Sequence, residues 1–590
     1  MMKKINRFFY IAAAALMMAA ACNPDNPENT PQPAPSTGGS DPVMTELTES
    51  SINGTSIGSN ITVAGVVKDK STGQGISGVN VTDGFTWSTT DANGVYQLTF
   101  NKLARKVYYT TPSDYKIYQN ADGYPFFFCK DNLEFGKKYR VDFTLEKLSA
   151  PETDFTLIAI GDPQCATTSD VARYASETIP KIRKDAANHK NVYAVTLGDI
   201  IFDSNNTWYP MYASMKNVIT GGVTIPFFQC MGNHDHDGTI INSSMDHATM
   251  QYTAQTNFVK YFGPQDYSFD RGNAHIVVMD DVWVTGFDSS SKSNGKTCTY
   301  ESGFSSEQLA WLTKDIANVK NAADKLVIIC CHIPFRSGAN SGGSSVNKTK
   351  NYAAVLSLLS TFKEAHIMIG HTHYNQNYIH SVKTKSGQPI YEHVHGAACG
   401  AWWASNSNVT GGPNGYGLYE ISGSTIVNWQ AKSSNFDDSF QMRIWDGNQE
   451  FTGSKGYKLK WSSTSNTVNG LTAKGFAAAD GAFVAEVFND DASNWKLEFW
   501  QNGTKVGDFT RAAASGICNI PIVSFWFNEK NKSTSTWTSS TASHFWYYKP
   551  ASGTPSAEKN WEVRATHTIA ASGEKNVYTA NKLTTDYSTF

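Results

Sequence analysis

Five apolar segments of strand length, each followed at once by a polar loop, constrain the fold of this chain more than any other feature. The segments are residues 155–160, 192–197, 225–230, 326–331 and 366–369, and the loops read GDPQ at 161–164, GD at 198–199, GNHD at 232–235, CH at 331–332 and GHTH at 370–373. An α/β sheet presents polar side chains in this way, at the carboxyl ends of its strands. The pattern therefore predicts an α/β region with one site built from all five loops.

The side chains in these loops are of types that bind metal ions. Asp, Asn, Gln and His predominate, and they suit divalent cations and phosphate chemistry. His371 and His373 are two residues apart, so they share one side of an extended segment. Of the 14 histidines, 12 fall between His189 and His395. A single Gly-Asp pair most often caps a turn or a helix, so the ordered set predicts the site, and no single motif does.

The ordered set resembles the calcineurin-like metallophosphoesterase family, whose pattern is DxH, GD, GNH[DE], H and GHxH. The resemblance covers residues 155–433 and implies a hydrolase of phosphate esters with two divalent metal ions. It implies that Asp199 bridges the two metals, that Asp162, Gln164 and His373 complete the first site, and that Asn233, His332 and His371 complete the second. The chain departs from the family at Gln164, where histidine is usual. Because an amide oxygen is a harder and weaker ligand than imidazole, we expect lower affinity there; loss of that metal is the alternative.

The resemblance also implies how the site works. The metals are Mn, Mg, Fe or Zn, with Mn favoured, and they hold a bridging hydroxide that attacks the phosphorus. Bound metal lowers the pKa of that water, so no protein base is needed. The leaving alkoxide needs a proton, and His234 is the candidate general acid. Asp203 is the candidate partner that keeps His234 charged, and a simple loop acid is the alternative for Asp203.

Substrate contacts are expected from residues that follow the metal loops. Arg336 is placed to pair with phosphate oxygens. His395 is a candidate contact, with a strand histidine satisfied by its neighbours as the alternative, and Trp402 and Trp403 are candidates to stack a base or sugar ring. The glycine-rich run at 411–417 is expected to be a loop near the cleft. The expected substrate is a small phosphorylated molecule: a nucleotide, a sugar phosphate or a lipid headgroup.

Two alternatives for function stay open at this point. The motif does not choose between phosphomonoesters and phosphodiesters, so a nucleotide or phospholipid-headgroup phosphodiesterase is one reading. A surface glycan-binding lipoprotein with an inert core is a second reading, because the chain is rich in aromatic residues. The net charge of −3 gives no long-range attraction to nucleic acid, and no nucleic-acid partner is expected.

The N-terminus has the pattern of an export signal. Residues 1–21 combine a basic start with an apolar run at 8–18, and three alanines precede Cys22. A cysteine at this place resembles a bacterial lipobox, although Ala19 stands where a large apolar residue is usual. Residues 23–40 are rich in Pro, Asn, Ser and Gly, which is typical of a tether, and we expect the tether to span 22–58. We expect an extracytoplasmic protein, facing the periplasm or on the cell surface, whose membrane contact is a lipid on Cys22; ordinary secretion is the alternative.

A chain of 590 residues is too long for one core. Residues 59–148 are expected to form a β-sandwich resembling carboxypeptidase regulatory-like modules, 153–433 an α/β two-sheet sandwich, and 434–590 a second β-sandwich. Helices are predicted at 170–188, 207–219, 305–319 and 351–362, a hairpin around 271–273 and another at Asn502-Gly503. Eight cysteines remain beyond Cys22, none in a CxxC pair, so they predict no disulfide framework but leave an isolated bridge open.

Overall fold

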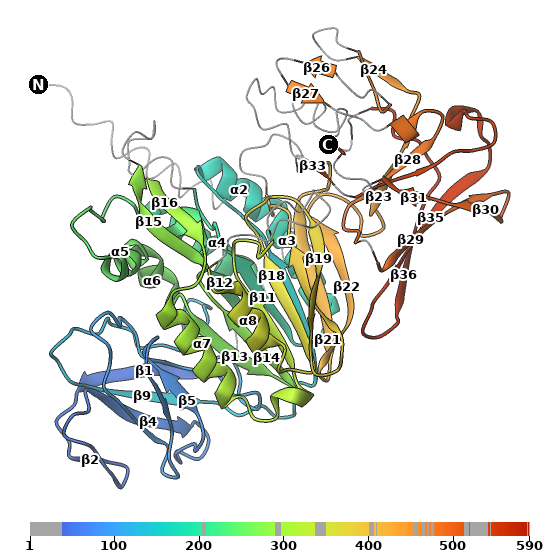
Figure 1. Ribbon diagram of the computed structural model, residues 1–590. Helices are drawn as coiled ribbons and strands as arrows, with labels where there is room; N and C mark the ends of the chain where they lie inside the picture. Colours follow the sequence, from blue (N-terminus) through green and yellow to red (C-terminus); the bar gives the residue numbers. More distant parts are fainter. Residues whose placement is uncertain are drawn as a thin grey trace, which may run out of the picture. The chain divides into compact units, whose positions relative to one another are not determined.

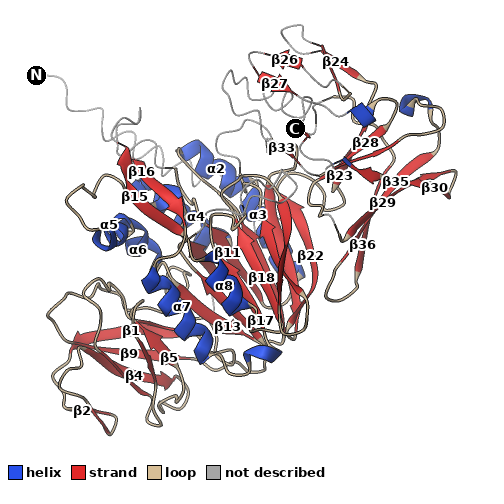
Figure 2. Ribbon diagram, viewed as in Figure 1, coloured by secondary structure: helices blue, strands red, loops and turns tan. Residues whose placement is uncertain are grey.

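Strands dominate the computed structural model, and its α-helices fall in the central part of the chain (Figure 1; Figure 2). The fold is multidomain and sheet-rich, with a central part between an N-terminal and a C-terminal part. The structure describes residues 38–590 except 203–207, 289–296, 337–349, 400–405, 409, 453–457, 463–465, 469–470, 474–476, 492, 513–517, 520–540, 543, 587 and 589–590. Among the described residues, no helix has both the length and the apolar character needed to cross a membrane.

The N-terminal part is built on two sheets. Four strands lie in the order β1 (Gly39–Glu46), β9 (Tyr139–Leu145), β4 (Val63–Asp69) and β7 (Val95–Leu98). Three short strands form the other sheet in the order β6 (Trp87–Thr89), β5 (Asn80–Thr82) and β8 (Tyr108–Tyr109), and β2 (Ser51–Ile52) pairs with β3 (Thr55–Ser56). Strands are thus present throughout the segment at 59–148 that is expected to be a β-sandwich, and β1 lies before it.

The first central sheet has five strands and contains three of the apolar segments. Its order is β12 (Phe227–Cys230), β11 (Val192–Leu197), β10 (Asp154–Ile160), β21 (Gly415–Ser422) and β22 (Thr425–Ser433). β10, β11 and β12 are parallel, whereas β21 is antiparallel to both of its neighbours. The three parallel strands therefore end at one edge of the sheet.

The second central sheet has six strands and contains the other two apolar segments. Its order is β13 (Tyr267–Arg271), β14 (Ala274–Val278), β17 (Leu326–Cys330), β18 (Glu364–Ile369), β20 (Pro389–Val394) and β19 (Gln376–Lys383). β13 and β14 form the expected hairpin, in which Arg271 pairs with Ala274, and β14, β17, β18 and β20 run parallel. A separate hairpin joins β15 (Val282–Asp288) to β16 (Thr297–Ser302).

Alternate residues of the parallel strands divide between two cores, as the pleat requires. Leu157 and Val195 pack in one core with Ile328 of the second sheet, so the two sheets share apolar contacts. Ile158 faces the other way and packs in a second core with Met215. These near-continuous apolar strands are buried on both faces, which is why they read as unbroken hydrophobic runs in the sequence.

Helices cover the outer faces of the central sheets (Figure 2). They are α2 (Thr168–Ser176), α3 (Thr178–Asn188), α4 (Trp208–Gly222), α5 (His247–Ala254), α6 (Thr256–Phe262), α7 (Ser306–Asn318) and α8 (Tyr352–Leu359), with short 3₁₀ turns at η3 (Asn233–Asp235) and η4 (Ala322–Asp324). The predicted helix at 170–188 is two helices, because Pro180 lies in the first turn of α3 and lacks the N–H that a continuous helix requires. The predicted helix at 305–319 is α7, and Ser305 and Gln308 form a capping box at its start.

The C-terminal part contains two four-stranded sheets. One has the order β23 (Met442–Asp446), β28 (Phe483–Val487), β34 (Phe545–Tyr548) and β31 (Thr510–Arg511); the other has β30 (Thr504–Asp508), β29 (Trp495–Gln501), β35 (Trp561–Thr568) and β36 (Lys575–Ala580). Short pairs join β24 (Glu450–Thr452) to β25 (Lys458–Lys460), β26 (Asn466–Val468) to β27 (Leu471–Ala473) and β32 (Cys518–Asn519) to β33 (Thr541–Ala542), and η5 (Ala477–Ala479) and η7 (Pro555–Ala557) are 3₁₀ turns. Asn502 and Gly503 both have positive φ, as the predicted hairpin turn demands.

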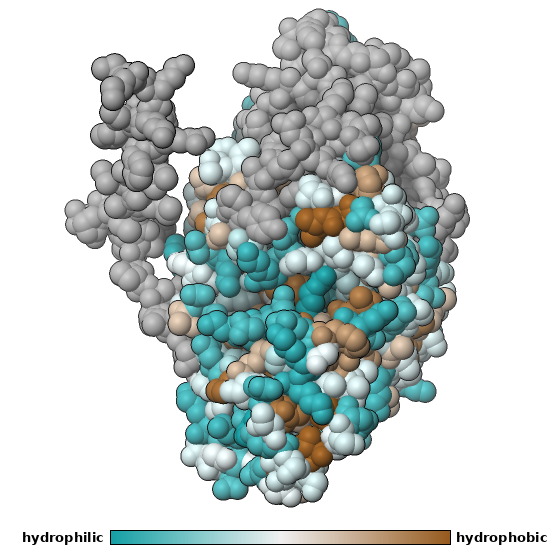
Figure 3. All heavy atoms as spheres, turned by 90° about the vertical axis from the view of Figure 1, so that its left-hand side faces the viewer, coloured by the Kyte–Doolittle hydropathy of each residue, from teal (hydrophilic) through white to brown (hydrophobic). Residues whose placement is uncertain are grey.

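The surface has no large apolar face on the side that Figure 3 displays. Among the coloured residues there, apolar side chains occur in small separate groups between hydrophilic ones. The aromatic residues of the C-terminal sheets lie mainly inside: Phe483, Leu497, Phe499 and Trp546 share one core. The described aromatics of this part are therefore mainly core residues, as expected for a folded β domain.

Candidate metal centre

The five polar loops leave the carboxyl ends of β10, β11, β12, β17 and β18. The predicted strands are confirmed to within two residues, with β12 beginning at Phe227 and β18 beginning earlier, at Glu364. β10, β11 and β12 are parallel in one sheet, and β17 and β18 are parallel in the other, so the loops of each sheet emerge at one edge. The two sheets also share a core. Seven side chains from these loops meet there: Asp162, Gln164, Asp199, Asn233, His332, His371 and His373.

One group of side chains converges on a single point. Asn233 Oδ1 lies 3.0 Å from His332 Nε2 and 2.9 Å from His371 Nδ1. His332 Nε2 lies 3.2 Å from both His371 Nδ1 and Asp199 Oδ2. The other nitrogen of His332, Nδ1, donates to the carbonyl oxygen of Leu197 over 2.8 Å, so in the neutral imidazole the lone pair of Nε2 faces the group. Four side chains thus direct lone-pair atoms at one place: Asp199, Asn233, His332 and His371.

Such an arrangement requires positive charge. Burial disfavours a charged imidazole, yet the Asp199 carboxylate raises the pKa of His332 to about 10. Burial also opposes ionisation of Asp199, but His332 beside it lowers the pKa of that carboxyl well below its usual range. Burial and the neighbouring His332 lower the pKa of His371 to about 3, which keeps its lone pair free. A divalent cation at this point supplies the charge that the donors need.

A second group shares Asp199 with the first. Ligand atoms of Asp162, Asp199 and His373 lie within 4.8 Å of one another. Asp162 is fully buried; its Oδ2 accepts from the backbone N–H of His371 over 2.8 Å, whereas its Oδ1 accepts no hydrogen bond and lies 3.4 Å from His373 Nε2. A buried carboxylate oxygen without a donor is costly in a folded protein. The residues present therefore fit a second cation, bridged to the first by Asp199.

Gln164 lies at the second group, as expected from the sequence. Its backbone N–H donates to the carbonyl oxygen of Asp199 over 2.7 Å, and its side-chain Nε2 lies 3.2 Å from Asp199 Oδ2. In this orientation the amide supports the shared carboxylate through a hydrogen bond. Direct binding of a metal by the Gln164 carbonyl oxygen stays a prediction.

The backbone of the site is strained in a specific way. Asp162, Gln164, Asp199, His371 and His373 all have left-handed φ angles, between 39° and 68°. Every other described non-glycine residue with positive φ is an asparagine, the residue that tolerates this conformation best. Strain of this kind persists only where the surrounding structure holds it, and it gathers at functional sites. The angles thus single out five of the seven proposed ligands.

Two glycines are needed for the ligands to approach. A Cβ on Gly232 would lie 2.2 Å from the Asp199 nitrogen and 2.3 Å from its Oδ1, and a Cβ on Gly198 would lie 2.5 Å from His332 Nδ1. Side chains do not tolerate such contacts, so the glycines of the GD and GNHD sequences are there to let the loops meet.

Two buried acids outside the predicted ligand set hold the ligand loops: Asp235, which the sequence predicts to order its own loop, and Asp281, which the sequence did not single out. Asp281 accepts from the backbone N–H groups of His332 and Ile333 over 3.0 Å, and Asp235 accepts from those of Gly232 and Ile200. Burial raises the pKa of both carboxyls to about 7, and the backbone N–H donors oppose this rise by stabilising the charged carboxylates. Asp281 follows β14 as Asp162 follows β10, and this strand-then-acid pattern is the signal that would have identified it.

His234 lies at the edge of the centre and is partly exposed. Its backbone N–H donates to Asp199 Oδ1 over 2.8 Å, and its ring packs on Phe202, with 4.6 Å between ring centroids. The histidine proposed as general acid is thereby tied to the shared carboxylate. Asp203, its predicted partner, lies outside the described residues.

The predicted substrate contacts are only partly placed. His395 is buried: its Nδ1 donates to the carbonyl oxygen of Ile369, its Nε2 lies 2.9 Å from the Tyr419 hydroxyl, and burial lowers its pKa to about 4. Both of its nitrogens are thus engaged with the protein. The Arg336 guanidinium lies 6.0 Å from the ring centroid of Tyr378. Trp402 and Trp403 lie outside the part of the chain that the structure describes.

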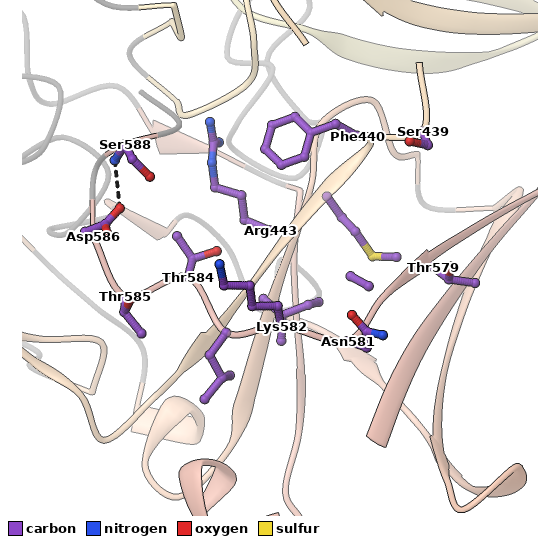
Figure 4. Close-up of a pocket in the computed structure, with 14 residues that line it drawn as sticks. Ser439, Phe440, Arg443, Thr579, Asn581, Lys582, Thr584, Thr585, Asp586 and Ser588 are labelled. Atoms are coloured by element: carbon purple, nitrogen blue, oxygen red, sulfur yellow. Dashed lines mark hydrogen bonds between the residues drawn. The ribbon is translucent and has the colours of Figure 1, made fainter. Parts of the chain in front are cut away.

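The glycine-rich run at 411–417 is not all loop, because Gly415 begins β21. A Cβ on Gly415 would lie 1.8 Å from the carbonyl oxygen of Lys432 on β22, so the strands can pair closely only with glycine here. A cavity of about 310 Å³ lies elsewhere, between β23 and residues 579–588 (Figure 4). Its lining includes Phe440, Arg443 and Lys582 and none of the seven proposed ligands.

Three family models match successive parts of the chain. Residues 61–148 match the model described as N terminal of Calcineurin-like phosphoesterase, residues 155–375 the model described as Calcineurin-like phosphoesterase, and residues 392–571 the model described as C terminal of Calcineurin-like phosphoesterase. The third model begins within β20 and so includes β21 and β22 of the central sheet. Together the matches account for most of the chain.

No curated protein matches the chain. A solved structure titled "Structure of PhoD" is 12% identical, with 77% of this chain and 91% of that chain covered and a TM-score of 0.33. A TM-score this low does not support a conclusion about the fold or the function of this chain. The matches to the three family models and the geometry of the seven side chains do not rely on this structure.

Proposed function

Because this chain belongs to the calcineurin-like phosphoesterase family and is a metal-dependent phosphoester hydrolase, we propose that it cleaves phosphate monoesters or diesters outside the cytoplasm. The observation that carries the proposal is the pair of buried ligand groups that share Asp199. Two cations bound side by side activate a water molecule and draw negative charge from the phosphate. An inert core with a glycan-binding role is disfavoured, since every ligand position except the one at Gln164 keeps a residue usual for the family.

The residues divide into two sets around Asp199. Asp162 and His373 would hold one cation with it, and Asn233, His332 and His371 would hold the other. Gln164 keeps the shared carboxylate in place through its amide and can offer its carbonyl oxygen when the amide turns. The set around Asp162 offers more oxygen ligand atoms than the set around His332. For this reason we favour Mn²⁺, with Mg²⁺, Fe²⁺ and Zn²⁺ as the other candidates.

His234 is proposed to protonate the leaving group. Its backbone is fixed to Asp199, while its side chain is partly exposed beside the centre. Among the loop histidines, His332 has its ring buried in the ligand cluster with both nitrogens engaged, whereas His234 is partly exposed and its ring packs on Phe202. A histidine with this placement can give a proton to the departing alkoxide and regain it from solvent.

Removal of metal tests the proposal. Dialysis against EDTA is expected to abolish turnover of p-nitrophenyl phosphate, and Mn²⁺ is expected to restore more activity than Mg²⁺ or Zn²⁺, because the site mixes oxygen and nitrogen donors. Metal content by mass spectrometry and turnover are measured on the same samples, and protein dialysed without chelator is the control. Full turnover in protein that retains no metal contradicts the proposal.

The choice between ester classes is made in the same assay. Bis-p-nitrophenyl phosphate tested beside the monoester shows which class is preferred, and a nucleotide or phospholipid-headgroup phosphodiesterase is the alternative that a diester preference would favour. The proposed substrate is a small phosphorylated molecule: a nucleotide, a sugar phosphate or a lipid headgroup. We propose no nucleic-acid partner, because the chain is mildly acidic.

We further propose the finer fold assignment and an anchored location. The central part would be a two-sheet α/β sandwich over 153–433, supported by the core that its two sheets share, and the flanking parts over 59–148 and 434–590 would be β-sandwiches. Residues 1–21 would be a lipoprotein signal, supported by their composition and by Cys22. The tether predicted at 22–58 would have to end before Gly39, because β1 (Gly39–Glu46) pairs with β9 in the N-terminal sheet.

The anchor has a direct test. Cys22→Ser is expected to move the protein from the membrane fraction to the soluble fraction of cells that produce it, because the lipid on Cys22 is the proposed attachment. Immunoblots of the two fractions measure the distribution, and Cys129→Ser is the matched control that should stay with the membrane. Equal partition of wild type and Cys22→Ser excludes the anchor.

A further inference from the structure

Two buried cysteines from distant parts of the chain meet directly beside the metal centre. Cys165 follows Gln164 on the loop after β10, and Cys399 follows β20 by five residues. Both side chains are fully buried, and both are free thiols in the structure. Both also lie against one backbone oxygen, that of Pro163, with Cys399 Sγ at 2.8 Å and Cys165 Sγ at 3.6 Å.

The two segments that carry the thiols are paired a few residues before the cysteines. Gly161 and Ala397 form a parallel bridge, and the N–H of Ala398 donates to the carbonyl oxygen of Gly161 over 2.8 Å. On its other side, the N–H of Cys165 donates to the carbonyl oxygen of Ile200 over 3.3 Å. Paired backbones with facing thiols are the arrangement in which a disulfide closes without a large movement.

We propose that Cys165 and Cys399 form a disulfide that fixes the loop of Asp162 and Gln164 to the segment after β20. The proposal goes beyond the hydrolytic function and does not depend on the identity of the substrate or the metal. It would be the isolated bridge that the cysteine pattern leaves open.

The chemistry is thiol–disulfide exchange with a small disulfide oxidant such as glutathione disulfide. The thiolate of one cysteine attacks the oxidant, which releases one glutathione thiol and leaves a mixed disulfide. The second thiolate then displaces the other glutathione, so two thiols and one oxidant give one protein disulfide and two glutathione thiols. Two protein sulfurs are oxidised, and the two sulfurs of the oxidant are reduced.

The bond is expected to close during folding and not after it. In the folded chain neither sulfur is open to solvent, so a disulfide oxidant does not reach it. In the folding chain both thiols are accessible, and the pairing of Gly161 with Ala397 brings them together before the core is complete.

The disulfide would restrict the loop that carries Asp162 and Gln164. Asp162 and Gln164 hold left-handed φ angles, and the loop that carries them leads directly into Cys165. A covalent link at this place removes conformations that the loop would otherwise adopt without metal. The oxidised protein should therefore bind metal more tightly than the reduced protein, by about tenfold if the link acts as a supporting contact to the ligands.

Refolding of the full chain tests the proposal whatever its location in the cell. Reduced, denatured protein is refolded in a buffer of glutathione and glutathione disulfide, free thiols are alkylated, and peptides are mapped by mass spectrometry. A peptide pair joined through Cys165 and Cys399 is the expected result. Alkylated Cys165 and Cys399 in folded protein, or either one joined to a different cysteine, overturns the proposal.

Variants separate the link from general packing. Cys165→Ser and Cys399→Ser should each raise the dissociation constant for Mn²⁺ of the oxidised protein and lower its thermal midpoint by several degrees, whereas dithiothreitol should then have no further effect. Cys230→Ser is the matched control, since Cys230 is equally buried and its thiol also contacts backbone carbonyls. It should keep the linked peptides and the response to dithiothreitol. An equal response to dithiothreitol in Cys165→Ser and wild type counts against the proposal.

Discussion

Asp199→Asn is expected to lower kcat/KM for phosphate ester hydrolysis by about a thousandfold and to reduce the bound metal. Asp199 is the one residue common to both ligand groups, and it is buried with His332 against it. An amide lacks the negative charge that two neighbouring cations need. Metal ions contribute several kcal/mol to transition-state stabilisation, and about 1.4 kcal/mol corresponds to each tenfold change in rate.

The measurement pairs steady-state kinetics with metal analysis on the same preparation. Asp324→Asn is the matched control, because Asp324 is an exposed acid in η4 and should leave both values unchanged. His371→Ala should resemble Asp199→Asn, since its Nδ1 belongs to the same donor cluster. Wild-type turnover in either variant, with the metal content also unchanged, rules out the proposed ligand set.

His234→Ala is expected to lower kcat by about a hundredfold or more for substrates with alkyl leaving groups, which is the usual contribution of a general acid. The loss should be much smaller for p-nitrophenyl esters, because p-nitrophenolate leaves without a proton. Metal content should stay at the wild-type level, since the tie between this residue and Asp199 runs through its backbone N–H.

The comparison of leaving groups is the measurement for His234. A plot of log kcat against leaving-group pKa should become steeper in His234→Ala than in wild type. His247→Ala, a change at an exposed histidine of α5 that stacks on Trp283, serves as the control. An equal loss for alkyl and p-nitrophenyl substrates would show that His234 positions the substrate or the metals and does not supply the proton.

The central fold was predictable because its strands are buried on both faces. β11 coincides with the predicted segment at 192–197. β10 is longer than the predicted segment at 155–160 by one residue, Asp154. The paired helices α5 and α6 were not predicted, since α5 has almost no apolar face to give a periodic signal. β21 was missed for a different reason: its glycines, which close pairing with β22 requires, have the composition of a loop.

The site was predictable as a set of residues but not as a geometry. The order of the five loops brought the seven candidate ligands to one place, because parallel strands end at one edge. The support from Asp281 was missed, since its role depends on the pairing of β14 with β17. The orientation of the Gln164 amide and the burial of His395 also depend on tertiary contacts that no local pattern contains.

The five left-handed ligand residues link the lifetime of the protein to the supply of cations around it. Each costs on the order of 1 kcal/mol of backbone energy, concentrated in a few neighbouring loops. A cation that binds only the folded chain adds about 2.7 kcal/mol of stability when present at a hundred times its dissociation constant. In metal-poor surroundings these loops open first and expose the chain to proteases. The enzyme therefore lasts longest where its own cofactor is abundant.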